Sequence, residues 1–456
     1  APDVQTGMHT DPQVIASQVT SMLGASLALQ SSGNLFLLEG RGEMVDALVR
    51  DHLLEVRLEQ PDSEAKRQFL QSVLDLYNKA TLEEELHIDQ VTNLVSDTPN
   101  RSQESLIRAS HFNQNPITRE QFAERKARDI EALSERTLTL MSTENAEELV
   151  GISVSRPQKI LLEKASEALR NNDSTAPANI LLCGPPGTGK TMMSRSLARR
   201  AGVPAFELHT PKAGLVGETE RLARLQQQVL GESRPHVAFV DEITEALPME
   251  RSGPDNDGGA SRAVGAALMS VMAEENRRGR SLLIGTTNCP YRVGAAMMKR
   301  MTVLPVLFPV RPDYPFILAI TIHRVSDAMA TIPRQRLADE AYVREAADIF
   351  YHKLASARDM RAALSNTAFL DGGLSEENIV QSALDYTGGQ NRASIIYSEL
   401  WSIRVTTSRA FFPWYENPSE FPFPDHLKDI VDSETGEVNY EALNERIDEL
   451  EPYANV

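Results

Sequence analysis

The sequence predicts an α/β fold in which a doubly wound parallel sheet of five strands lies between an all-helical N-terminal domain and a C-terminal helical lid. Between about residues 179 and 310, short apolar runs alternate with segments long enough for a crossover helix, which is typical of a parallel sheet covered on both faces. Before and after this region, apolar residues recur at helical spacing instead.

The N-terminal third is expected to be helical after a disordered lead. Residues 1–12 are polar and lack periodicity, whereas residues 13–145 carry apolar side chains at spacings of three and four, as at Leu70, Leu74 and Tyr77. Few glycines interrupt this pattern, so we expect an all-helical domain over 13–145.

The sheet is expected within residues 146–312, after a loop of polar residues and a proline at 171–178. Five apolar runs of strand length follow this loop: 179–183, 205–209, 237–240, 281–285 and 303–310. Because the segments between them are long enough for crossover helices, the strands are expected to be parallel.

The C-terminal part returns to a helical pattern over 313–410, which is expected to form the lid. The tail at 411–456 begins with prolines among aromatic residues and ends in an acidic helical stretch. It is too apolar for a simple linker, and three docking partners stay open: the chain's own lid, a neighbouring subunit or another protein.

Composition excludes several classes of protein. The 456 residues include 46 basic and 64 acidic ones, a net charge of −18, which makes nucleic acid an unlikely partner. Two cysteines are too few for a disulfide framework or a zinc cluster, and no run approaches the ~18 apolar residues of a membrane helix. We therefore expect a cytoplasmic protein without membrane insertion.

A glycine-rich segment between the first strand and the following helix carries the strongest chemical signal. It consists of Gly184, Pro185, Pro186, Gly187, Thr188, Gly189, Lys190 and Thr191, with Met192 behind it. Glycines let backbone amides wrap around a polyphosphate at a helix N-terminus, a lysine reaches the outer phosphates and a hydroxyl binds Mg²⁺. We therefore expect nucleotide binding here, with Lys190 on the phosphates and Thr191 on the metal.

An apolar strand that ends in two carboxylates, Asp241 and Glu242, follows some 50 residues after this loop. Asp241 would bind the water shell of Mg²⁺, and Glu242 would polarise a water for attack on the terminal phosphate. With one further strand between the two motifs, the pair predicts phosphate hydrolysis.

Together these motifs resemble the AAA+ ATPases, and within them the AAA subgroup proper, over about 149–405. Further matches stand in the correct order: Val150, Gly151 and Ile152 beside the adenine, Ala246-Leu247-Pro248 after the acidic strand, and Thr286-Thr287-Asn288 at the end of the fourth strand. The resemblance implies ATP and Mg²⁺ as cofactors, and it implies that Asn288 orients the attacking water.

The segment Gly214–Glu220 resembles the central-pore loop of this subgroup, which grips an extended polypeptide drawn through a hexameric ring. Leu215, Val216 and Gly217 would form the grip. Leu215 stands where the family usually has an aromatic residue, so it offers less contact area. A plain helix-capping turn is the alternative.

Two arginines are assigned from the resemblance. Arg300 lies where the family places a finger arginine that reaches the neighbouring subunit's nucleotide, although the usual Gly-Arg-Phe-Asp-Arg string is missing. Lys299 is the alternative, and both could be surface charges. The turn Thr387–Arg392 resembles sensor 2, in which Gly389 would pack near the ribose and Arg392 would either reach the terminal phosphate or face solvent.

These features predict a Mg²⁺-dependent ATPase that forms a homo-oligomeric ring, a hexamer by the family resemblance, because the finger arginine must come from a neighbour. Two functions stay open. A motor that remodels, unfolds or disassembles a protein substrate is favoured by Leu215-Val216-Gly217. An ATP-controlled conformational switch or assembly scaffold is favoured by the missing arginine string and the non-aromatic Leu215.

Overall fold

A computed structural model describes seven segments of the chain: 62–96, 98–134, 137–141, 156–209, 218–246, 260–388 and 391–454. The lead expected at 1–12 and the helical pattern expected over 13–61 lie outside the described residues. Within the described segments, no helix has both the length and the apolar character needed to cross a membrane.

Four helices make up most of the described N-terminal part: α3 (Ser63–Leu76), α4 (Ile88–Val95), α5 (Asn100–Asn113) and α6 (Arg119–Leu133). Two of these helices begin at capping side chains. The Asp62 side chain accepts a hydrogen bond from the backbone of α3, and Thr118 and Gln121 close a capping box at α6. Apolar side chains of all four helices are buried in one cluster, among them Leu70, Leu94, Ile107 and Phe122.

The sheet has six strands: β1 (Leu138–Leu140), β2 (Asn179–Cys183), β3 (Ala205–Leu208), β4 (His236–Val240), β5 (Ser281–Thr287) and β6 (Thr302–Pro305). Their order is β1-β3-β4-β5-β2-β6, and all neighbours from β3 to β6 are parallel. The predicted doubly wound sheet of five parallel strands is thereby confirmed. The last strand is shorter than the apolar run at 303–310 suggested.

The sixth strand differs from the expectation of helices alone over 13–145. β1 pairs antiparallel with β3, with Leu138 opposite Leu208 and Leu140 opposite Phe206. Three residues are too few to show a period of two in the sequence, and their extended conformation depends on the free edge of β3.

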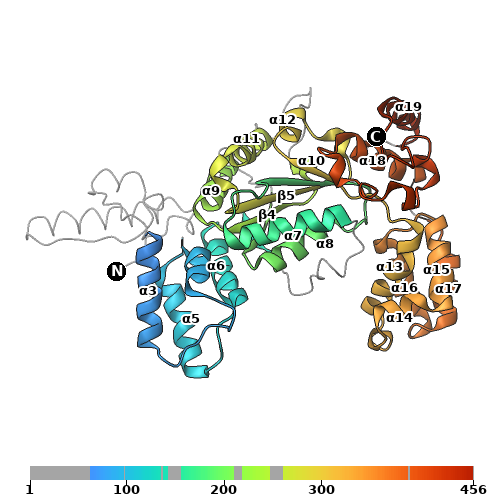
Figure 1. The fold of residues 1–456 in the computed structure, drawn as a ribbon. Helices are drawn as coiled ribbons and strands as arrows, with labels where there is room; N and C mark the ends of the chain where they lie inside the picture. The colour runs from blue at the N-terminus through green and yellow to red at the C-terminus, as the bar shows by residue number, and fades with distance from the viewer. Residues whose placement is uncertain are drawn as a thin grey trace, which may run out of the picture. The chain divides into compact units, whose positions relative to one another are not determined.

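Alternate side chains of the central strands point to opposite faces of the sheet and enter two separate cores. Ile180 and Leu182 belong to the core shared with α7 (Arg156–Asn171) and α8 (Lys190–Ala201). Leu181 and Cys183 belong to the core shared with α9 (Glu218–Glu232) and α11 (Ala260–Ala273). Figure 1 shows these two helix pairs on either side of the strands. Both faces are covered, as the continuous apolar runs predicted.

Five helices of the expected lid share one core: α13 (Tyr314–Val325), α14 (Arg334–Asp339), α15 (Ala341–His352), α16 (Ala357–Asp371) and α17 (Glu376–Asp385). The next helix, α18 (Arg392–Val405), contributes Ile395 to this core and its remaining buried apolar residues to another. The lid boundary at 410 remains a prediction.

The aromatic tail packs on α18 of its own chain. Trp414 is stacked on Phe412 with ring centroids 4.9 Å apart and donates a hydrogen bond to the carbonyl oxygen of Gly436 at 3.1 Å. Their cluster also contains Leu400 of α18 and Leu443 of α19 (Tyr440–Leu450). Of the docking partners that the sequence left open, these tail aromatics pack on the chain's own lid, at α18.

Candidate functional site

The glycine-rich segment forms the loop between β2 and α8. Gly187 has a φ of 78° and Gly189 a φ of 92°, both in the left-handed region that favours glycine. A Cβ at Gly184 would collide with the carbonyl oxygen of Val306. The loop therefore requires glycine for its shape, and it ends at the N-terminus of α8, where free backbone N–H groups attract anions.

Lys190 is the first residue of α8 and is folded into this loop, with only 6% of the residue exposed. Its Nζ donates hydrogen bonds to the carbonyl oxygens of Gly184 and Pro185, each at 2.8 Å, and to Oδ1 of Asn288 at 2.6 Å. Burial lowers the pKa of Lys190 to about 8, and the Glu242 carboxylate opposes this effect. An anion brought into the loop would therefore stabilise the charged lysine.

Asp241 and Glu242 follow β4 directly and are held by one residue of β5. The hydroxyl of Thr286 donates to Oδ1 of Asp241 at 2.6 Å and accepts from the backbone N–H of Glu242 at 3.2 Å. Glu242 has a φ of 44°, a left-handed conformation that costs a non-glycine residue roughly 1–2 kcal/mol. Backbone strain of this kind clusters at functional sites.

Asn288 follows β5 and joins the acidic pair to the loop. Its backbone N–H donates to Oε2 of Glu242 at 3.2 Å, its side-chain amide donates to the other carboxylate oxygen, and its Oδ1 accepts from Lys190. These contacts follow from the sheet order, because β4, β5 and β2 are neighbours and their carboxyl ends meet. The structure thus brings together Lys190, Glu242 and Asn288.

Thr191 and Asp241 are the residues expected to hold Mg²⁺. Thr191 is half-buried in the first turn of α8, and Asp241 is exposed at the end of β4. A hydroxyl and a carboxylate are oxygen donors, and Mg²⁺ is commonly held by one or two such groups together with phosphates and waters. The chemistry of this donor pair fits Mg²⁺.

Two lid residues that the sequence analysis missed lie against the phosphate loop. Ser356 is buried and begins α16 with a capping box closed by Asp359. A Cβ at Gly187 would collide with the hydroxyl of Ser356 and would lie 3.7 Å from Cβ of Arg358. The Arg358 charge also contributes to the lowered pKa of Lys190. The pattern Ser-x-x-Asp before an apolar run marks this helix start and could have drawn attention to it.

Arg392, the sensor-2 candidate, lies beside the C-terminal tail. It is exposed at the start of α18, and the preceding Asn391 donates its side-chain amide to the backbone carbonyl of Tyr453 at 2.5 Å. The pKa of Asp425 in the tail is lowered mainly by Lys428, with a smaller contribution from Arg392. The charge of Arg392 therefore acts on the tail.

The finger candidates Arg300 and Lys299 are both exposed after α12 (Ala295–Met298). Arg300 donates a hydrogen bond to the carbonyl oxygen of Ala296 at 2.9 Å, within its own chain. Its assignment to a neighbouring subunit's nucleotide stays a prediction.

Several predicted residues lie outside the described segments and stay predictions. They are the adenine segment Val150, Gly151 and Ile152, the pore segment Leu215, Val216 and Gly217, and the sensor-2 glycine Gly389.

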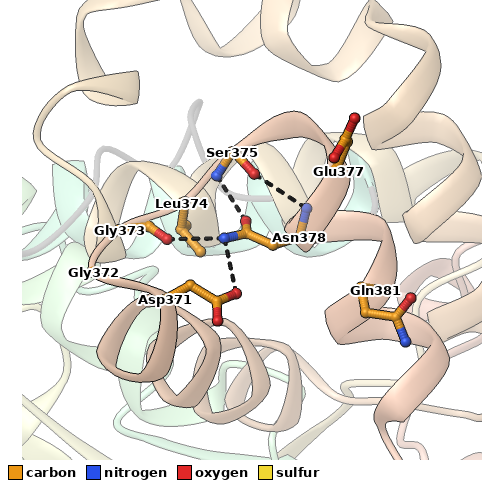
Figure 2. A pocket seen from close by; sticks show the side chains of 8 residues that line it. All are labelled: Asp371, Gly372, Gly373, Leu374, Ser375, Glu377, Asn378 and Gln381. Carbon is orange, nitrogen blue, oxygen red and sulfur yellow. Dashed lines mark hydrogen bonds between the residues drawn. The ribbon is translucent and has the colours of Figure 1, made fainter.

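A hollow of about 670 Å³ opens at the turn between α16 and α17, apart from the residues of the phosphate loop. Figure 2 shows Asn378 at its centre, donating to Asp371 at 3.2 Å and to the carbonyl oxygen of Gly373 at 3.0 Å. These bonds, with one accepted from the backbone of Ser375, fasten the turn to its own helix. We read the hollow as a consequence of this turn.

Comparison with known proteins points to one family. Residues 180–306 match the model described as "ATPase family associated with various cellular activities (AAA)". Protein mac-1 of Caenorhabditis elegans is 39% identical over 134 residues, which are 29% of this chain and 16% of that protein. Fidgetin-like protein 1 of Drosophila melanogaster is 31% identical over 152 residues, which are 33% of this chain and 29% of that protein.

A solved structure of the FIGL-1 AAA domain in complex with ADP matches with a TM-score of 0.45 and 17% identity, over 61% of this chain and 97% of that chain. The chain spans less than a third of the length of the curated relatives that it matches. The family match extends from β2 to β6 and therefore contains Lys190, Glu242 and Asn288.

Proposed function

Since residues 180–306 make this chain a member of the AAA+ superfamily, we propose that it binds ATP with Mg²⁺ in the loop at 184–191 and hydrolyses it. The observation that carries the proposal is the hydrogen-bonded set Lys190, Asn288 and Glu242, drawn from three neighbouring strand ends. A lysine, an amide and a carboxylate at one edge of a parallel sheet meet the needs of phosphate binding and water activation.

Each of these groups has a separate role in the reaction. Lys190 gives up its hydrogen bonds to the loop carbonyls, binds the outer phosphates instead and stays protonated beside them. Glu242 accepts a proton from water while the water oxygen bonds to the terminal phosphorus and the bond from that phosphorus to the leaving ADP oxygen breaks. Asn288 orients the water. Mg²⁺, held through Thr191 and Asp241, neutralises phosphate charge when bound.

Arg358 is our candidate for the lid arginine that contacts the terminal phosphate, in place of Arg392. Its Cβ lies against the phosphate loop, and its charge acts on Lys190. Among the described residues Arg358 forms no ion pair, whereas the charge of Arg392 acts on the tail. A phosphate in the loop would give Arg358 an anionic partner.

Glu242→Gln tests the hydrolysis proposal. The amide cannot accept the proton, so we expect nucleotide binding close to wild type and turnover lower by at least about a hundredfold. Glu232→Gln removes an exposed carboxylate at the end of α9 and serves as the control. Turnover of Glu242→Gln at the wild-type rate would contradict the assignment.

We further propose that the chain works as a ring, a hexamer by family resemblance, in the cytoplasm. The free thiols Cys183 and Cys289 support a reducing compartment. The surface position of Arg300 suits a residue that reaches the nucleotide of a neighbouring subunit. The mass of the native particle, measured with and without a slowly hydrolysed ATP analogue, tests the ring.

Within such a ring the work that we favour is remodelling, unfolding or disassembly of a protein substrate. The segment Leu215-Val216-Gly217 supports it through its resemblance to a pore loop. The alternative is an ATP-controlled switch or assembly scaffold, which the non-aromatic Leu215 and the missing arginine string support. In Leu215→Ala, a motor keeps ATP turnover and loses substrate processing, while a switch loses neither.

A further inference from the structure

Helix α18 holds the turn that carries Asn288. Ser398 of α18 is 4% exposed, and its hydroxyl donates a hydrogen bond to the backbone carbonyl oxygen of Asn288 at 2.6 Å. The side chain of this same asparagine contacts Glu242 and Lys190. One hydroxyl therefore connects a helix after the lid core to the centre of the proposed active site.

The same helix also holds the far end of the turn. Tyr291 lies in the short 3₁₀ helix η4 (Pro290–Arg292), and its ring centroid is 5.1 Å from that of Tyr397 and 6.1 Å from that of Trp401. Both partners belong to α18. With Ser398 at one end and this aromatic contact at the other, α18 fixes both the position and the direction of the turn.

The tail in turn anchors α18. Glu399, which is 2% exposed, accepts a hydrogen bond from the backbone N–H of Phe308 at 3.2 Å and pairs with Nε2 of His426 at 2.8 Å. Leu400 packs in the same cluster as Trp414 of the tail. The tail and Phe308 therefore hold the part of α18 that carries Ser398.

We propose that Ser398 is a positioning residue for ATP hydrolysis, whose hydrogen bond keeps the amide of Asn288 at the Glu242 carboxylate. The inference rests on the proposed function, which gives Asn288 its role in turnover. Misplacement of a water-orienting group by a fraction of an ångström lowers the rate of the chemical step. Within the described part of the chain, the Ser398 hydroxyl bonds to Asn288 and not to the phosphate loop, so the loss should fall on kcat and leave KM for ATP nearly unchanged.

Single variants give the first test. We expect Ser398→Ala to lower kcat roughly tenfold, with KM for ATP within about twofold of wild type. Ser402→Ala is the matched control, because Ser402 is buried one turn later on α18 and its hydroxyl bonds to the carbonyl oxygen of Ser398 and to Cys183 rather than to the turn that carries Asn288. Ser398→Thr keeps the hydroxyl and should restore most of kcat.

A double-variant comparison separates positioning from a general structural effect. Without the Asn288 side chain there is nothing left to position, so Ser398→Ala should cost no further activity in an Asn288→Ala background. A tenfold loss in both backgrounds would overturn the inference, and so would wild-type kcat in Ser398→Ala while Asn288→Ala is slow. If Asn288→Ala alone hydrolyses ATP at the wild-type rate, Asn288 does not have the proposed role, and the inference about Ser398 is wrong as well. This comparison tests the role of Ser398 even if threonine does not fit at position 398.

Discussion

The hydroxyl of Ser356, which begins lid helix α16, lies so close to Gly187 of the phosphate loop that no side chain fits between them. Gly187 therefore meets two demands at once, the left-handed φ of 78° and this close approach of the lid. The loop expected to bind nucleotide and the helix that carries Arg358 are in direct contact. If the loop moves when phosphate binds, α16 must therefore move with it.

We expect Gly187→Ala to weaken nucleotide binding by more than tenfold, because the added methyl group strains the loop and displaces α16. Gly372→Ala is the control, since Gly372 has a similar φ of 74° with open space around its Cβ position. Titration of a fluorescent ATP analogue into both variants measures the difference. Equal affinities would mean that the contact with Ser356 is unimportant for binding.

Arg358→Ala should lower ATP turnover about tenfold or more, because it removes the charge of a lid residue whose Cβ lies against the phosphate loop and which acts on Lys190. Arg392→Ala should leave turnover unchanged, since the Arg392 charge acts on the tail. Steady-state hydrolysis by the two variants, compared side by side, checks the assignment. The reverse pattern would return the sensor-2 role to Arg392.

Sequence reasoning located Lys190, Glu242 and Asn288 because each follows a recognisable strand, and parallel strands place their carboxyl ends at one edge. It proposed Arg392 for sensor 2 and did not consider Arg358, because helix-start signals are local. Asn391 caps α18 and Ser356 caps α16, and only the tertiary structure shows which cap lies on the phosphate loop.

The strand β1 and the place of the tail were beyond sequence reasoning for related reasons. Residues 138–140 are too few to show a strand period, and they become a strand because the edge of β3 is available. The number of aromatic residues in the tail indicated that another surface covers them. That surface is α18, and it forms only when distant segments pack together.

The pKa of Lys190 predicts how binding depends on pH. Burial lowers it from 10.5 to about 8, so the empty site loses its lysine charge as pH rises through about 8. Phosphate favours the charged form, so affinity should be constant below that pH and fall above it, by up to about tenfold per pH unit. Calorimetry in buffers of different ionisation heat should show proton uptake on binding near pH 8 and none near pH 6.5. Binding without proton uptake at the higher pH would contradict the lowered pKa.

Trp414 should be the main stabiliser of the tail, because it is 1% exposed, stacks on Phe412 and bonds to Gly436. Trp414→Ala removes this packing and leaves a cavity, which typically costs about 3–5 kcal/mol. Tyr415→Ala alters the next side chain, 54% exposed, and should stay within about 0.5 kcal/mol of wild type. Urea unfolding followed by circular dichroism measures both.

Since the tail anchors α18, and α18 holds Asn288, Trp414→Ala should also lower ATP turnover under conditions in which the sheet remains folded. A Trp414→Ala protein as stable and as active as Tyr415→Ala would show that the tail is not coupled to the site.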